Sequence, residues 1–123
     1  GERVVSDLQS ESFAADLASK NGLGGFYQWG APWDPKSLYG PMSPLTYVND
    51  VHTPLMILHS EDDIRTPIDS TLQEYNLLKI LGRTVTYVDV PGETHDLNRT
   101  GSPIHRVERL HIMADWFAKY LQP

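Results

Sequence analysis

The chain has 123 residues, of which 40% are apolar and 21% charged, so it is long enough for one domain with a packed core. Its net charge of −6 and the lack of any Lys or Arg run argue against a nucleic-acid or anionic-membrane surface as the main function. The absence of cysteine excludes disulfides, thiolate metal sites and a cysteine nucleophile. No apolar stretch approaches the roughly 20 residues that cross a bilayer. The compartment is left open by composition, and we favour the cytoplasm.

The first elements are short. Residues 2–6 contain two β-branched valines, Val4 and Val5, which suit the end of a buried strand. Because the chain opens on Gly1 and not on methionine and runs straight into this apolar pair, we expect it to begin inside a longer protein; a cloning scar at Gly1 is an equal alternative. Residues 7–22 place Leu8, Phe13 and Leu17 at loosely helical spacing before the breaker Asn21-Gly22, which predicts an imperfect helix. From residue 22 to 44 the chain is rich in Gly, Pro and aromatics, so regular structure there should be short.

The rest of the chain predicts alternating strands and helices. Residues 54–59 are an apolar run entered by proline, typical of a parallel strand buried on both faces. A helix should begin at Pro67 and end at Gly82, and residues 84–90 predict a second strand before Pro91-Gly92. Residues 103–121 predict an amphipathic C-terminal helix. This order predicts an α/β fold in which parallel strands are joined by right-handed crossovers.

Two polar loops follow the two predicted strands, and both should open at the same edge of the sheet. The first loop contains Asp63 and the second contains His95, 32 positions later. A carboxylate next to an imidazole can fix its tautomer and leave the other ring nitrogen to act as a general base. In α/β-hydrolases the catalytic triad runs Ser, Asp, His along the chain, and this sequence supplies the last two in that order.

Four segments carry a more specific resemblance: Ser43–Val48, Thr53–His59, Glu61–Pro67 and His105–Leu110. In this order and spacing they resemble the C-terminal catalytic region of the prolyl oligopeptidase family of serine peptidases, nearest to its acylaminoacyl-peptidase and dipeptidyl-peptidase-like branch. The resemblance implies that residues 1–123 are part of an α/β-hydrolase catalytic domain. It implies no cofactor and no metal.

The resemblance also implies roles for individual residues. The family acid lies two residues before an arginine, which falls on Asp63 and Arg65, with Asp62 as the adjacent alternative. The family histidine, in a Gly-x-x-His turn, falls on His95. Arg65 matches an arginine that binds a substrate backbone carbonyl; the alternative is an ion pair that orients Asp63.

The chain departs from the family pattern in one large respect. No Gly-x-Ser-x-Gly occurs in it, so the nucleophile elbow is absent. In the family the serine precedes the segment that resembles residues 1–6, and a β-propeller or other N-terminal domain lies further upstream. We therefore expect an upstream part of the same protein to supply the serine, and we expect this chain alone to be inactive.

Other candidate residues have weaker support. Phe26 and Trp29 belong to an aromatic-rich loop that the family uses to line a substrate pocket, although capping of the core is an equal alternative. His59 should pack or hydrogen-bond beneath the site, while His105 and His111 read as ordinary helix residues. A metal site built from His59, Asp63 and His95 lacks supporting spacing, so none is predicted.

The expected function is therefore acyl transfer from a short peptide to water through an acyl-enzyme. An esterase on the same scaffold is one alternative, because sheet and triad do not fix the substrate. The other alternative is a non-catalytic fragment that self-associates into a homo-oligomer through exposed sheet edges.

Overall fold

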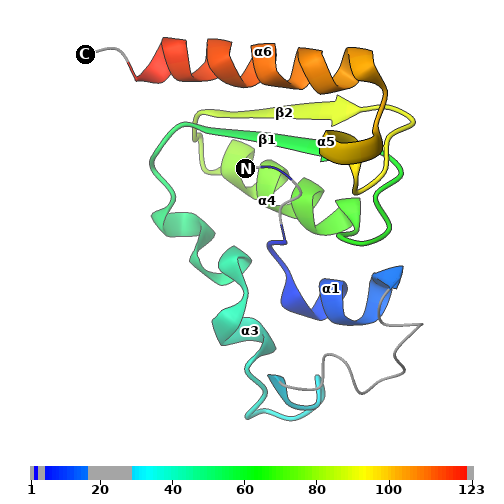
Figure 1. Cartoon of the computed structure of the whole chain (residues 1–123). Helices are drawn as coiled ribbons and strands as arrows, with labels where there is room; N and C mark the ends of the chain where they lie inside the picture. Colours follow the sequence, from blue (N-terminus) through cyan, green and yellow to red (C-terminus); the bar gives the residue numbers. More distant parts are fainter. Residues whose placement is uncertain (1, 3–4, 17–28, 122–123) are drawn as a thin grey trace.

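The computed structural model describes residues 2, 5–16 and 29–121 of the chain (Figure 1). Its regular elements, in chain order, are α1 (Leu8–Ala14), α3 (Tyr39–Met42), the 3₁₀ helix η3 (Pro44–Asp50), β1 (Leu55–Ser60), α4 (Ile68–Ile80), β2 (Val85–Val90), α5 (Leu97–Thr100) and α6 (Pro103–Tyr120).

The two strands form a parallel pair, as the sequence predicts. The register runs from Leu55 opposite Val85 to Ser60 opposite Val90, and α4 connects the strands. Leu58 also makes an isolated parallel bridge with Glu2, on the edge of β1 that faces away from β2. Of the strand predicted over residues 2–6, the described residues show only this bridge, because Val5 and Ser6 are not in a strand; Val4 lies outside the described residues.

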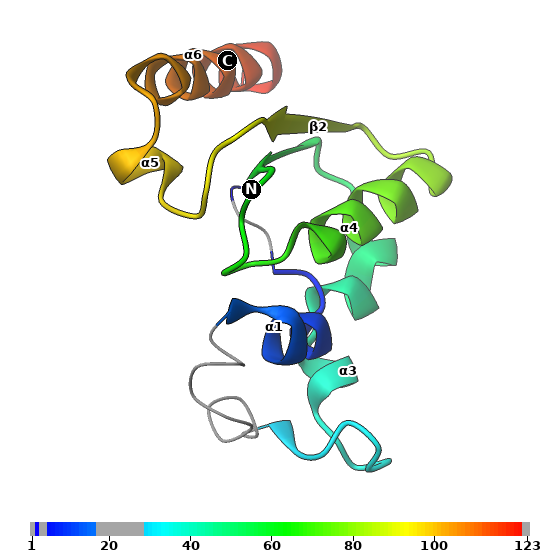
Figure 2. The same cartoon turned by 90° about the vertical axis from the view of Figure 1, so that its right-hand side faces the viewer.

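One face of the sheet packs against α4. Ile57 and Leu78 are fully buried there and contact Val85, while residues of η3 such as Val48 close the cluster. Burying a side chain of this size contributes about 1.5–3 kcal/mol, so this cluster fixes α4 against the strands. Figure 2 shows α4 and α6 on opposite sides of the sheet.

The other face, formed by the alternate residues of each strand, packs against α5. Leu58, Val90 and Leu97 form its buried cluster. Above it, α6 is 18 residues long and has no buried residue among those described. Large apolar side chains of α6 are from 52% to 68% exposed: Ile104, Val107, Leu110 and Phe117.

The helix predicted over residues 7–22 is shorter than expected. Asp7 is its N-cap, and its carboxylate accepts the backbone N–H groups of Gln9 and Ser10. The helix ends at Ala14 because Ala15 is extended and the N–H of Asp16 donates to the carbonyl of Ile64, 2.8 Å away, in place of a helical bond. Residues 17–22 lie outside the described residues.

The later elements agree with the sequence to within one or two residues. Pro67 precedes the first turn of α4, and Gly82, with a φ of 67°, ends the helix in the left-handed conformation that glycine adopts without strain. The prediction of short structure within the described residues 29–44 is confirmed by the four-residue α3. The short helices η3 and α5 were not predicted.

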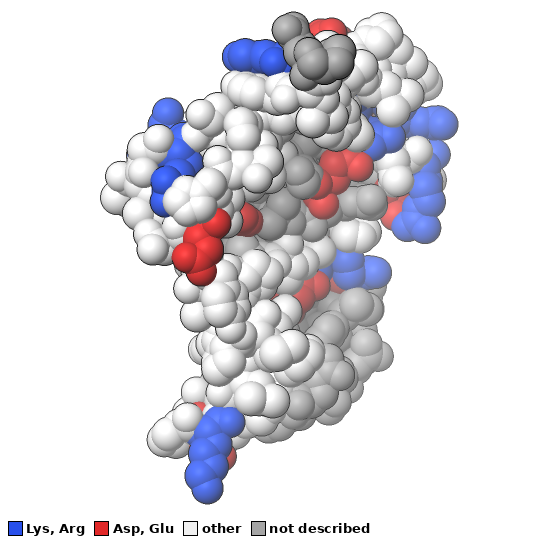
Figure 3. All heavy atoms as spheres, turned by 90° about the vertical axis from the view of Figure 1, so that its left-hand side faces the viewer, with Lys and Arg blue, Asp and Glu red and all other residues white. Residues whose placement is uncertain are grey.

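Acidic and basic side chains are interspersed on the face of the molecule shown in Figure 3. Among the described residues, no helix is both long and apolar enough to span a membrane.

Candidate active site

Asp63 lies in the loop that connects β1 to α4, at the carboxyl end of β1. Its carboxylate accepts three bonds from its own loop: the backbone N–H groups of Arg65 and Thr66 reach Oδ1 at 2.9 Å, and the hydroxyl of Thr66 reaches Oδ2 at 2.8 Å. Asp63 is only 4% exposed. The loop therefore holds a buried carboxylate in one orientation.

His95 comes from the loop after β2 and meets Asp63 side chain to side chain. Its Nδ1 lies 2.9 Å from Oδ2 and 3.2 Å from Oδ1 of Asp63. An ionised carboxylate can only accept, so Nδ1 carries the proton and Nε2 keeps its lone pair. The His95 side chain is 30% exposed, whereas that of Asp63 is fully buried. The imidazole is thus partly accessible to solvent, whereas the carboxylate that it contacts is not.

The surroundings of Asp63 favour its charged form. Burial raises the pKa of its carboxyl, but the hydrogen bonds from Thr66 and His95 outweigh burial, so the pKa lies below its ordinary value. The carboxylate consequently stays ionised near neutral pH and can stabilise a protonated imidazole opposite it.

The geometry distinguishes Asp63 from its neighbour Asp62. The Asp62 side chain is exposed, and its backbone N–H donates to the carbonyl of Glu93 at 2.9 Å. Asp62 therefore ties the two loops together through the backbone, while Asp63 contacts the histidine.

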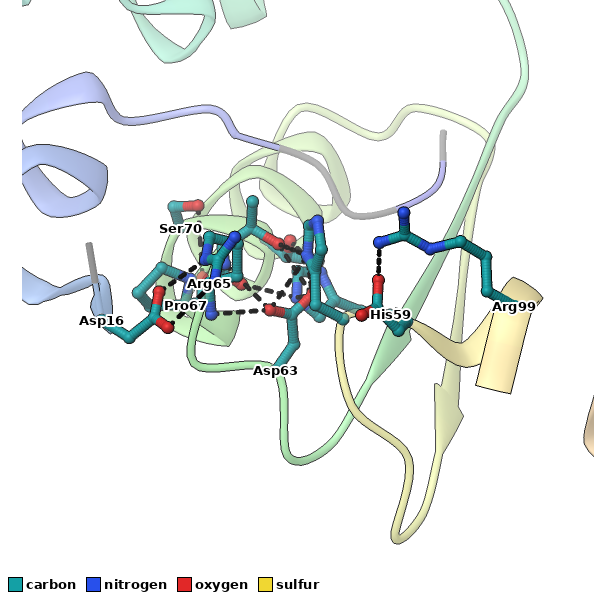
Figure 4. Close-up of polar contacts among 11 residues, drawn as sticks. Asp16, His59, Asp63, Arg65, Pro67, Ser70 and Arg99 are labelled. Atoms are coloured by element: carbon teal, nitrogen blue, oxygen red, sulfur yellow. Dashed lines mark hydrogen bonds and ion pairs between the residues drawn. The ribbon is translucent and has the colours of Figure 1, made fainter. Parts of the chain in front are cut away.

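The guanidinium of Arg65 pairs with Asp16 at the end of α1. Its Nε lies 2.6 Å from Oδ1 and its Nη2 3.1 Å from Oδ2 of Asp16 (Figure 4). This hydrogen bond raises the pKa of Arg65 above its ordinary value. The alternative in which Arg65 forms an ion pair with Asp63 is wrong: its backbone N–H contacts Asp63, and its side chain pairs with Asp16.

His59 lies beneath the pair, near the end of β1, and is fully buried. Both of its ring nitrogens are hydrogen-bonded, to Thr66 and Thr71, which confirms the expectation that it bonds beneath the site. Within the described part of the chain, no group of three or more His, Asp or Glu could hold a metal ion.

The aromatic candidates are placed less fully. Phe26 lies outside the described residues. Trp29 is half-buried, and its carbonyl accepts from Leu38 N–H at 2.8 Å and from the Ser37 hydroxyl at 3.2 Å. A cavity of about 640 Å³ beside α1 is lined by Phe13 and Trp33 among others, but not by Asp63, His95 or Trp29. It is therefore not the space in front of the Asp63–His95 pair.

A second anchor holds the loop that carries His95. Glu93 is buried, and its Oε1 accepts from His105 Nδ1 at 2.7 Å and from Ser102 N–H at 2.9 Å. The hydrogen bond from His105 and, to a smaller extent, that from Ser102 lower the pKa of Glu93. Glu93 and His105 thus tie the His95 loop to the start of α6, although His105 reads from sequence as an ordinary helix residue.

Three contributors to the site were missed from sequence: Thr66, Asp16 and Glu93. Thr66 had a detectable signal, because an Asp followed three residues later by a Thr before a helix is a pattern in which the carboxylate accepts backbone N–H groups. Asp16 contacts Arg65 across 49 positions and Glu93 contacts His105 across 12, so their partners depend on the fold.

The chain is similar to several known proteins. It is 43% identical over 79 residues to the uncharacterized peptidase YuxL of Bacillus subtilis and 33% identical over 84 residues to an acylamino-acid-releasing enzyme of Arabidopsis thaliana. These matches cover 64% and 68% of this chain. A solved acylaminoacyl peptidase in complex with Z-Gly-Gly-Phe-chloromethyl ketone superposes with a TM-score of 0.84 at 28% identity over 95% of the chain.

The chain spans 12% and 11% of the two curated relatives and 19% of the solved chain. The described elements form part of an α/β-hydrolase fold, as these likenesses show. The model of the prolyl oligopeptidase family matches residues 6–123, so this chain belongs to the prolyl oligopeptidase family.

Proposed function

We propose that this chain supplies the acid and the base of a serine peptidase, with Asp63 as the acid and His95 as the base. The observation that carries the proposal is the contact of His95 Nδ1 with the buried Asp63 carboxylate at 2.9 Å. A serine in an upstream part of the same protein completes the triad. We call the chain together with that part the full-length protein.

The proposed reaction follows from this arrangement. The serine hydroxyl attacks the substrate carbonyl carbon while His95 Nε2 takes its proton, and the imidazolium then gives that proton to the leaving amine. In the second half, His95 takes a proton from the water that attacks the acyl carbon; the bond between the acyl carbon and the serine oxygen then breaks, and His95 returns the proton to the serine. Asp63 keeps the imidazole in the Nδ1–H tautomer and stabilises its positive charge; it does not itself take the proton.

Arg65 is proposed to bind a backbone carbonyl of the substrate. Its side chain is 39% exposed, and the bonds to Asp16 involve Nε and Nη2. The Asp16 pair holds the planar guanidinium in a fixed plane, which suits a directional bond to a carbonyl oxygen. The proposal that Phe26 and Trp29 line a pocket for an apolar substrate side chain rests on the family resemblance.

The substrate class is proposed to be a short peptide, an acyl-peptide or an oligopeptide. Similarity to an acylamino-acid-releasing enzyme and to an acylaminoacyl peptidase that was solved with a peptidyl chloromethyl ketone supports it. The alternative within hydrolases is an esterase.

The test compares two substrates in the full-length protein, an N-acetyl-aminoacyl p-nitroanilide and the simple ester p-nitrophenyl acetate. A peptidase cleaves the anilide with a kcat/KM that far exceeds its value on a simple acetate ester. Hydrolysis of esters alone supports the esterase. Undiminished anilide cleavage in a His95→Gln variant contradicts the proposed base.

One observation favours the self-association alternative for the isolated chain. The large apolar side chains on α6 are more than half exposed, as listed above, and a face of this kind favours association. Light scattering of the 123-residue chain over a range of concentrations checks this: a mass that rises with concentration supports self-association, and a constant monomer mass opposes it. A cytoplasmic location also stays a prediction, to be checked by cell fractionation.

A further inference from the structure

His59 is a buried titratable residue that the proposed reaction does not use. It occupies the penultimate position of β1, pairs in the sheet with Asp89, and is 0% exposed. Its Nε2 lies 2.8 Å from the carbonyl oxygen of Thr66, and its Nδ1 lies 2.7 Å from the hydroxyl of Thr71 on α4. The ring therefore connects the strand, the acid loop and the helix that follows it.

These contacts define the tautomer of the neutral ring. A carbonyl can only accept a hydrogen bond, so Nε2 carries a proton and donates a hydrogen bond to the carbonyl of Thr66. In the neutral ring Nδ1 is then an acceptor, and it receives the hydroxyl proton of Thr71. In this tautomer both ring nitrogens of a neutral His59 have a hydrogen-bond partner, as fully buried polar groups in proteins normally do.

Thr66 links His59 to the catalytic pair. The same residue whose carbonyl accepts from His59 donates its N–H to Oδ1 and its hydroxyl to Oδ2 of Asp63. Its hydroxyl oxygen also lies 3.4 Å from His95 Nδ1. A displacement of Thr66 would therefore rotate the Asp63 carboxylate relative to the imidazole that it faces.

We propose that His59 is a positioning residue for the Asp63–His95 pair, acting through Thr66 to fix the orientation of the Asp63 carboxylate. The inference rests on the proposed function of that pair. It assigns to His59 no contact with substrate and no proton transfer. Its nearest approach to the acid is 3.6 Å, from Nε2 to Oδ2, which is too long for a hydrogen bond and agrees with an indirect role.

The test uses variants of the full-length protein. His59→Leu removes both hydrogen bonds at similar volume, and His59→Gln keeps an N–H donor that can reach the Thr66 carbonyl. His52→Leu is the matched control, because His52 is exposed and precedes the opposite end of β1. Kinetics on the anilide substrate are expressed per active site, counted by titration with a fluorophosphonate, so that loss of folded protein does not count as loss of turnover.

The expected result is a split between kcat and KM. In His59→Leu, kcat per active site falls roughly 10- to 100-fold, as for a misplaced catalytic group, while KM stays within about twofold. The acid limb of the pH profile of kcat/KM moves to lower pH, because the imidazolium loses a well-placed carboxylate. His59→Gln recovers most of kcat and the original limb, and His52→Leu matches the parent protein.

Other results overturn the inference. A His59→Leu protein with normal kcat per active site and an unshifted acid limb shows that His59 only supports folding. If His59→Leu does not fold, Thr71→Val takes its place, because it removes the hydroxyl that donates to Nδ1. It must then lower kcat in the same way but by a smaller factor, and an unchanged kcat in Thr71→Val overturns the inference. His95→Gln is measured in parallel: retained activity there overturns the proposed function as well, whereas an inactive His95→Gln beside a normal His59→Leu overturns this inference alone.

Discussion

At the scale of single residues, the site is organised around one buried carboxylate. Arg65 and Thr66 donate three hydrogen bonds to Asp63, and Nδ1 of His95 donates a fourth. A buried charge is stable only when its acceptor positions are filled in this way. The bonds from the loop fix where the carboxylate points, and the imidazole then takes its orientation from the carboxylate.

Asp63→Asn tests this directly. The amide keeps the size of the side chain, but it presents a donor to His95 and favours the wrong imidazole tautomer, so we expect kcat of the full-length protein to fall by roughly 10³- to 10⁴-fold. Steady-state kinetics on the anilide measure it. Asp62→Asn is the matched control and should keep a kcat near that of the parent protein. A comparable loss of kcat in both variants would contradict the assignment of Asp63 as the acid.

Glu11 on α1 has a pH-dependent effect on stability. Burial, followed by the charge of Asp63, raises its pKa to about 7, while Arg65 partly offsets this increase. Its Oε2 has no hydrogen-bond partner among the residues that the structure describes. A carboxyl whose pKa is raised on folding contributes stability that is present at low pH and lost as pH rises through the folded value. The ionised form of Glu11 therefore destabilises the fold above about pH 7.

We therefore expect Glu11→Gln to stabilise the full-length protein at pH 8 by roughly 1–3 kcal/mol and to have little effect at pH 5. Urea unfolding at the two pH values measures the difference. Glu108→Gln, at an exposed position on α6, should show no such dependence. Equal effects of Glu11→Gln at both pH values would exclude the ionisation as the cause.

At the scale of elements, two loops at the carboxyl ends of β1 and β2 bring the pair together, and each loop has its own anchor. The loop after β1 is held by the hydrogen bond between its Thr66 carbonyl and His59 and by the Asp16–Arg65 pair. The loop after β2 is held through Glu93, which receives bonds from Ser102 and His105 at the start of α6. The strand register sets the distance between the loops, and the anchors set their orientation.

The close approach of α5, Glu93 and the start of α6 is sensitive to added volume. A methyl group at Gly101 would lie 2.5 Å from the Leu97 carbonyl oxygen and 2.6 Å from Glu93 Oε2. Because the first of these contacts is with backbone, we expect Gly101→Ala to destabilise the protein by about 1–3 kcal/mol. Gly40→Ala has open space around it and should be near neutral. Thermal unfolding of both variants checks the prediction, and an equal response from the two contradicts it.

At the scale of the whole molecule, sequence predicted the elements whose signals are local and continuous. The apolar run of β1, the β-branched residues of β2 and the breakers around α4 placed these elements to within one or two residues. The predicted end of α1 was wrong, because the true end depends on a backbone hydrogen bond from Asp16 to Ile64, which no local sequence pattern reveals. The four-residue helix α5 is too short to show a period.

The site divides in the same way. The meeting of Asp63 and His95 was predictable because the carboxyl ends of parallel strands share one edge of the sheet. The partner of Arg65 was not, since Asp16 lies in the segment just after α1, whose packing against the acid loop is set only by the fold. Likewise, Glu93 gave no sign in sequence that it binds the start of α6.

One whole-molecule prediction concerns the chain by itself. Since it contains no Gly-x-Ser-x-Gly, we expect a fluorophosphonate probe to leave the isolated 123-residue chain unlabelled. Intact-mass spectrometry after incubation checks this. A covalent adduct on any serine of the isolated chain would show that an activated nucleophile lies within it.

The central claim is that His95, oriented by Asp63, activates a serine elsewhere in the protein. The most direct measurement is the rate of fluorophosphonate labelling of the full-length protein, with and without the substitution His95→Gln. The account predicts that the parent protein is labelled at one serine and that labelling of His95→Gln is slower by roughly 10³-fold or more. Equal labelling rates in the two proteins would contradict it.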